Sequence, residues 1–205
     1  MLTRAACVVA LAGLASLASG QIQYVSQDRW VSLTGSGTTD QESSASDFAA
    51  FNGNLTAGFG TVATQSSGLE PLGIVATGTA QGATTPPAGT GNISARSSFA
   101  VVFDLLTEAE YTLDLDVFAE FATWSFQGPS LNIEQGLTTP FTLSGFEQSG
   151  TLGPGQYSFA FEINTSGAAS GILSTYDFRF DIVPTPGVCA VLAVGALATT
   201  RRRHK

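Results

Sequence analysis

Apolar and polar residues alternate along four segments in the second half of the chain. Every second residue is apolar in residues 99–105, 111–121, 156–164 and 176–182. A period of two gives a strand one buried face and one wet face, which is typical of antiparallel sandwiches. The expected inward positions are Phe99, Val101, Phe103, Leu105, Tyr111, Leu113, Leu115, Val117, Ala119, Phe121, Tyr157, Phe159, Phe161, Ile163, Tyr176, Phe178, Phe180 and Ile182.

The first half of the chain is patterned more weakly. Strands are expected over residues 29–34, 55–63 and 74–80, and further ones over 130–133 and 142–152. Residues 82–91 are expected to form a loop, because Pro86 and Pro87 cannot donate to a ladder. Turn residues recur about every ten positions and no long helical period occurs. The fold class predicted for residues 21–182 is therefore all-β, as a single antiparallel β-sandwich of jelly-roll-like form.

Residues 152–157 contain the clearest turn signal. Pro154 presets the bend, Gly153 and Gly155 accept unusual backbone angles, and Tyr157 is expected to point inward at the start of the next strand. This turn resembles the Pro-Gly-x-Tyr hairpins of extracellular sandwich and jelly-roll modules. It indicates a fold and carries no chemistry.

The N-terminal residues 1–20 have the form of a secretory signal peptide. Arg4 supplies a positive start, an apolar stretch follows, and Ala18, Ser19 and Gly20 offer small residues for cleavage before Gln21. We expect a signal helix there, and therefore export of the remaining chain.

The C-terminal residues 183–205 contain three parts in a fixed order. A turn of Val183, Pro184, Thr185, Pro186 and Gly187 precedes thirteen apolar or small residues and then the basic cluster Arg201, Arg202 and Arg203. Thirteen helical residues reach about 20 Å, against a hydrocarbon core of ~30 Å. We expect a short, transient transmembrane helix whose basic end faces the cytoplasm. A plain tail anchor and a buried core helix are the alternatives.

A Pro-x-Pro turn, a short apolar helix and a terminal arginine cluster resemble the PEP-CTERM sorting signal. Thr185 occupies the position where that family usually has Glu. The resemblance covers residues 183–205 only. It implies a bacterial protein that is exported, processed at its C-terminus by an exosortase, and associated with exopolysaccharide at the cell surface or in the extracellular matrix.

Charge and residue usage exclude several classes of function. All sixteen acidic residues fall between Asp28 and Asp181, against Arg29, Arg96 and Arg179, so the central part carries about −13. Such a surface repels nucleic acid. The only histidine is His204, and both cysteines lie in the terminal segments. Nucleophilic schemes and zinc sites that need these side chains are unavailable to the central domain.

The strand at residues 111–121 presents acidic side chains on its outward face. Asp114, Asp116 and Glu120 are spaced by two or four residues, about 7 or 14 Å along a strand. The first interpretation is a solvated acidic face that discourages edge pairing. A calcium site is the second, because Ca²⁺ takes oxygen ligands. A glycosidase carboxylate pair is the third.

Three aromatic residues lie in or just after this acidic strand. Phe118, Trp124 and Phe126 are candidate sugar contacts if the segment before Gly128 and Pro129 is an exposed loop. The alternative is that Trp124 and Phe126 cover the end of the core.

These observations together predict an exported, non-enzymatic protein of the cell surface or extracellular matrix, without a cofactor unless calcium binds. The alternative function is a carbohydrate-binding module that uses the aromatic loop. An enzyme is the third hypothesis. The expected partners are an exosortase-type enzyme, the membrane before processing, and exopolysaccharide, but not nucleic acid.

Overall fold

The computed structural model describes residues 22–35, 41–83, 93–165 and 172–184, and these residues are almost entirely β-strand. The elements in chain order are β1 (Ile22–Gly35), β2 (Gln41–Ser44), β3 (Phe51–Ala57), a single 3₁₀ turn (Gly58–Gly60), β4 (Thr61–Glu70), β5 (Gly73–Gln81), β6 (Ile93–Leu105), β7 (Ala109–Gly128), β8 (Leu131–Leu152), β9 (Gly155–Asn164) and β10 (Leu173–Pro184). The predicted all-β, antiparallel class is confirmed.

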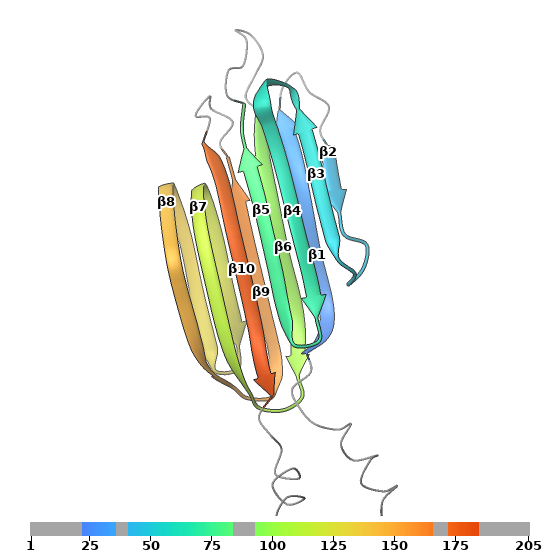
Figure 1. The fold of residues 1–205 in the computed structure, drawn as a ribbon, viewed down its shortest axis with the longest axis vertical. Helices are drawn as coiled ribbons and strands as arrows, with labels where there is room; N and C mark the ends of the chain where they lie inside the picture. The colour runs from blue at the N-terminus through green and yellow to red at the C-terminus, as the bar shows by residue number, and fades with distance from the viewer. Residues whose placement is uncertain (1–21, 36–40, 84–92, 166–171, 185–205) are drawn as a thin grey trace, which may run out of the picture.

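All ten strands belong to one antiparallel sheet. Their order is β2-β1-β6-β9-β7-β10-β5-β4-β3, and β8 pairs with the other edge of β7. The sheet folds over on itself until it nearly closes into a barrel. Figure 1 shows the resulting flattened shape, with β5, β4 and β3 in front of β6 and β1.

Strand β7 is the element that both layers share. Its first half pairs with β10 from Ala109 to Phe118, and its second half pairs with β9 from Phe121 to Gln127. The register against β8 shifts between Ala119 and Phe121. An irregularity of this kind bends the paired strands and increases their twist, and at this point β7 changes its partner from β10 to β9.

The burial pattern of β7 also changes at this point. Ala119 is buried, Glu120 and Phe121 are half-buried, and Ala122, Trp124 and Phe126 are the next buried residues. Phe121, which was predicted to point inward, is therefore not part of the buried core, because burial in β7 passes from odd-numbered to even-numbered residues between Ala119 and Ala122. The predicted loop around Trp124 is also wrong, since this segment is strand up to Gly128.

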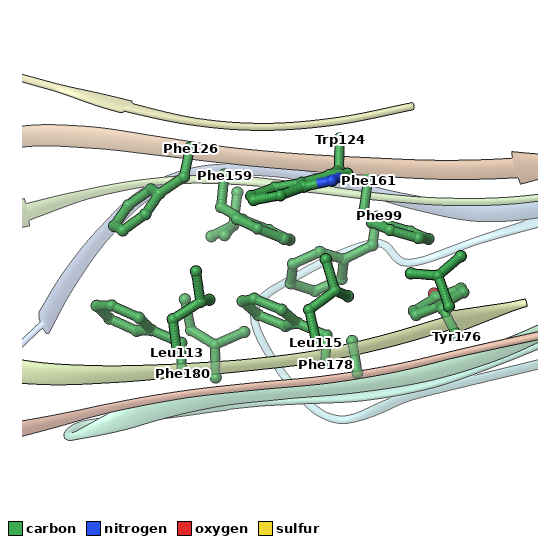
Figure 2. Packing of buried hydrophobic residues seen from close by; sticks show 14 of the residues in the cluster. Phe99, Leu113, Leu115, Trp124, Phe126, Phe159, Phe161, Tyr176, Phe178 and Phe180 are labelled. Carbon is green, nitrogen blue, oxygen red and sulfur yellow. The ribbon is translucent and has the colours of Figure 1, made fainter. Parts of the chain in front are cut away.

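Aromatic rings from both layers fill the interior (Figure 2). Phe159 of β9 stacks on Phe178 of β10, with ring centroids 3.9 Å apart. Phe126 meets Phe180 edge-on at 5.5 Å. Each fully buried side chain of this size contributes about 1.5–3 kcal/mol, and favourable ring geometry adds to that. Apart from Phe121, all the predicted inward positions are buried, so the period of two identified the core correctly.

Small side chains line the interior along β4 and β5. Ala63, Ala76 and Ala80 are fully buried there. Gly78 is required by close packing, because a Cβ atom at this position would lie 2.3 Å from Cε1 of Tyr176. The front strands can therefore approach β6 closely on this side of the molecule.

Arg29 closes the side of the fold where β1 and β4 face each other without pairing. Its side chain is completely buried. Nε donates to Oε1 of Gln27 at 2.9 Å, and Nη1 donates to Oγ of Ser67 on β4 at 3.1 Å. Nη2 donates to the carbonyls of Asp47 and Ala49, at 2.6 and 2.8 Å. One guanidinium thus joins β1, β4 and the connection between β2 and β3.

The first and last strands are tied to the same turn. The backbone N–H of Ile22 donates to the carbonyl of Pro71, and that of Ile182 donates to the carbonyl of Leu72, at 2.9 and 2.8 Å. Strand β1 therefore begins, and β10 ends, at one end of the molecule, beside the β4–β5 turn.

Several strand boundaries differ from the predicted ones. The strand expected over residues 55–63 is divided by Gly58–Gly60, where Phe59 and Gly60 have positive φ and reverse the chain. Residues 130–133 and 142–152 belong to one strand, β8. The turn before Tyr157 connects β8 to β9, which do not pair, so it is a connection between non-adjacent strands and not a hairpin. Tyr157 is buried as predicted, and its hydroxyl donates to the carbonyl of Gly153.

Replacing Arg29 tests its role in closing the fold. Arg29→Met keeps most of the apolar stem but leaves the carbonyls of Asp47 and Ala49 without their donor. We expect the free energy of unfolding to fall by about 1–3 kcal/mol, measured by urea denaturation. Arg179→Met, at an exposed position, should change it by less than about 0.5 kcal/mol. Equal effects of the two changes would show that Arg29 is not needed for closure.

The tyrosines provide a test by pH. Burial raises the pKa of Tyr24, Tyr111, Tyr157 and Tyr176, the only four in the chain, and raises that of Tyr176 to about 12. Because the folded state holds these protons more tightly, stability is complete below about pH 10 and declines as pH rises towards 12. Phenolate absorbance should therefore appear together with the loss of the circular dichroism signal. Ordinary titration near pH 10 in a folded protein would contradict this packing.

Candidate functional site

The acidic residues predicted on β7 do lie on its outer face. Asp114, Asp116 and Phe118 are all exposed there. Glu120 lies beyond them, close to the register shift, and its backbone N–H donates to Oγ of Ser174 at 3.0 Å. Asp114 and Asp116 therefore belong to one site, and Glu120 is not part of its lining.

Strand pairing brings further charged residues to Asp114 and Asp116. Asp177 on β10 is the direct partner of Asp116, while Arg179 on β10 and Glu147 on β8 flank Asp114. Cross-strand partners of this kind have Cβ atoms about 4.5–5.5 Å apart. Together they form a shallow hollow of about 290 Å³, lined by Asp114, Leu115, Asp116, Gly145, Phe146, Glu147, Asp177 and Arg179.

The hollow depends on a bulge in β8. The register between β7 and β8 shifts between Leu115 and Val117, opposite Gly145, whose φ is +66°. The N–H of Gly145 is thereby directed to Oδ1 of Asp116, at 2.6 Å. One oxygen of this carboxylate is held by the backbone, so the position of the side chain is fixed.

Arg179 is the basic residue of the hollow, and its guanidinium pairs with Asp181, two residues further along β10. Its Nε donates to Oδ2 of Asp181, and this hydrogen bond is the main cause that raises the pKa of the guanidinium. The charge of Asp181 adds to the effect, and that of Asp114 contributes least. Four carboxylates and one partly neutralised cation leave the hollow acidic.

The acidic hollow could attract a cation or accept hydrogen bonds from hydroxyl groups. However, no three acidic side chains in residues 22–35, 41–83, 93–133, 142–165 and 172–184 are grouped closely enough to hold a metal ion. The calcium site at Asp114, Asp116 and Glu120 therefore stays a prediction to be tested, and the spacing of these residues along β7 fits a solvated acidic face.

The three candidate sugar contacts are separated by the structure. Trp124 and Phe126 are buried, with 3% and 1% of their surface exposed, and Phe146 packs edge-on against Trp124 at 5.2 Å. Only Phe118 is exposed, at 44%. Trp124 and Phe126 thus cover the core, as the alternative interpretation had it, and Phe118 is the one ring of the three that a ligand can reach.

Most of the predicted sorting signal lies outside the described residues. Val183 and Pro184 end β10, where they pair with Glu110 and Ala109 of β7. Thr185, Pro186, Gly187, Arg201, Arg202 and Arg203 are not described, and neither are residues 1–20 of the predicted signal peptide. The part of the chain that is described contains no helix with the length and apolar character needed to cross a membrane.

Comparisons with known proteins identify no family for this chain. No family model matches the chain, and no curated protein is similar to it. One solved structure with a weak resemblance is a GH31 alpha-xylosidase from Xanthomonas citri. The two chains are 12% identical over 78% of this chain and 18% of that enzyme, with a TM-score of 0.29. A likeness of this size does not bear on fold or function.

Thermal unfolding with calcium and with a chelator tests the acidic hollow. If it is only a solvated face, calcium should not shift the unfolding temperature, and Asp114→Asn with Asp116→Asn should alter stability by less than about 0.5 kcal/mol. A bound ion at a hundredfold excess over Kd would instead add about 2.7 kcal/mol to the wild type, and the double variant would lose it. We expect the first outcome; a shift confined to the wild type would contradict it.

Proposed function

We propose that this protein is an exported, non-enzymatic component of the cell surface or extracellular matrix, associated with exopolysaccharide and processed at its C-terminus by an exosortase-type enzyme. The observation that carries the proposal is the order of features in residues 183–205: a Pro-x-Pro turn, a short apolar run and an arginine cluster. The predicted signal peptide supports export independently.

The folded part of the chain is compatible with removal of both terminal segments. Strand β1 begins at Ile22 and β10 ends at Pro184, so the ten strands of the described core lie between the two predicted cleavage points. The β4–β5 turn holds both ends of this core. In the proposal, this end faces the membrane until the tail is cut, and the long sheet faces extend away from it.

A binding role agrees with the surface better than catalysis does. The central part of the sequence contains no histidine or cysteine. The acidic hollow is shallow, and its charged side chains are exposed on an open sheet face. Catalysis by paired carboxylates requires a site that holds the sugar with its scissile bond between the two carboxylates. We therefore regard the domain, a variant of the jelly-roll-like sandwich, as a scaffold that presents its outer faces.

The second candidate function is carbohydrate binding. The exposed ring of Phe118 favours it, since Phe118 stands next to Asp116 on the same outer face of β7. This candidate and the first are compatible, because a matrix protein can be retained by the polysaccharide that it binds.

Mass spectrometry of the native protein tests the proposed processing. The mature chain should start near Gln21 and end between Pro184 and Gly187, without residues 201–205. Replacing Arg201, Arg202 and Arg203 with Ser should prevent retention of the tail at the membrane, because these charges stop its passage. Arg179→Ser, which removes an arginine from the folded part, should leave processing unchanged. Recovery of the intact C-terminus from surface protein would favour a plain tail anchor.

A further inference from the structure

We propose that the outer face of β3, β4, β5, β10 and β7 binds an uncharged polysaccharide strand, with Phe118 as its stacking platform. The polar residues that share this outer face form the hydroxyl face: Asn52, Asn54, Thr64, Ser66, Thr77, Thr79 and Thr175. The inference rests on the proposed function in one respect: an exported matrix protein would meet such a polymer outside the cell. The binding itself is a property of the folded domain.

The register of the sheet arranges the hydroxyl face in rows. Asn54, Thr64, Thr79, Thr175 and Phe118 are successive cross-strand partners from β3 to β7. The strands lie about 4.8 Å apart, so this row extends over about 19 Å. It ends at the exposed ring of Phe118.

A second row runs beside the first, two residues further along each strand. It consists of Asn52, Ser66, Thr77, Asp177 and Asp116, again as successive partners. The spacing between the rows is about 7 Å. This row ends in the acidic hollow, so the exposed ring and the two carboxylates lie at the same end of the hydroxyl face.

Hydrogen bonds between neighbouring side chains hold this face in place. Oγ1 of Thr64 and Oγ1 of Thr79 are 2.6 Å apart, and Oγ of Ser66 donates to Oδ1 of Asn52 at 2.8 Å. A hydroxyl can donate once and accept twice, so each one keeps bonding capacity for a ligand. Side chains that are already ordered lose less entropy when a ligand binds.

The chemistry of both rows suits a sugar chain. An exposed aromatic ring can cover the apolar C–H face of a pyranose, while amides, hydroxyls and carboxylates bond its equatorial hydroxyl groups. Asp116 and Asp177 provide acceptors, and Asp116 is already positioned by the N–H of Gly145. The regular rows match an extended repeating polymer better than a compact ligand.

Charge determines which kind of polysaccharide fits. The only charged residues in the two rows are Asp116 and Asp177, and the central part of the chain carries three arginines against sixteen acids. Arg179 beside them is engaged with Asp181. A polyanionic polymer would be repelled by these carboxylates and by the negative charge of the domain, whereas an uncharged glycan would not.

Affinity electrophoresis of the purified protein tests this inference. Gels containing hydroxyethylcellulose or galactomannan should retard the wild type, and gels containing alginate should not. Phe118→Ala should weaken the retardation about tenfold, because the ring loses its apolar contact with the sugar. Thr79→Val, which keeps the shape but removes a hydroxyl, should weaken it to a smaller extent.

A matched control separates this face from any exposed ring. Phe48 is exposed to a similar degree, at 42%, but stacks against Tyr24 away from the hydroxyl face. Phe48→Ala should bind as the wild type does, and thermal melts should show that all the variants fold. The inference would be overturned if the wild type were not retarded, if all variants were retarded equally, or if only alginate retarded the protein. Self-association through Phe118 in the absence of glycan would also overturn it. None of these results depends on export or tail processing, which mass spectrometry tests separately.

Discussion

A single sheet that folds over on itself must fill the space between its own two halves, and this requirement governs the rest of the structure. The aromatic rings of β6, β7, β9 and β10 meet the need on one side, where Phe159 and Phe178 stack across the layers. On the other side β4 and β5 contribute small side chains such as Ala63 and Ala80, and the layers close around the buried guanidinium of Arg29. Between the two halves, β7 is continuous: it pairs with β10 before Ala119 and with β9 after it, so one strand belongs to both layers.

Because most aromatic side chains are used in the interior, the outer faces are mainly polar, with a few exposed rings such as Phe118. The front layer carries rows of Thr, Ser and Asn that end at Phe118 and at the carboxylates of the hollow. The period of two that builds the core therefore also fixes the chemistry of the surface, since every inward ring places its neighbours outside. A scaffold of this kind presents a broad flat face more readily than a deep catalytic cleft, which agrees with the proposed binding role.

The sequence predicted the strands of the second half because their alternation is strong and local. It failed where the alternation is interrupted: at Gly58–Gly60, where positive φ reverses the chain, and after Ala119, where burial passes to the even-numbered residues, so that Trp124 and Phe126 are buried. Strand β2 carries no apolar pattern and was not predicted. The candidate site was found in part. Asp114, Asp116 and Phe118 are neighbours on one strand, but Asp177, Arg179 and Thr175 join them only through pairing with β10, which local patterns do not specify.

The central claim is that this protein uses the hydroxyl face and Phe118 for binding while the interior serves only to hold that face. The most direct measurement is an NMR titration of the isotopically labelled protein with a soluble, uncharged gluco-oligosaccharide, following backbone amide shifts. We expect the amide shifts to change in β5, β10 and the first half of β7, around Thr79, Thr175 and Phe118. Changes confined to β1, β6 and β9, on the opposite layer, or no changes at saturating sugar, would contradict it.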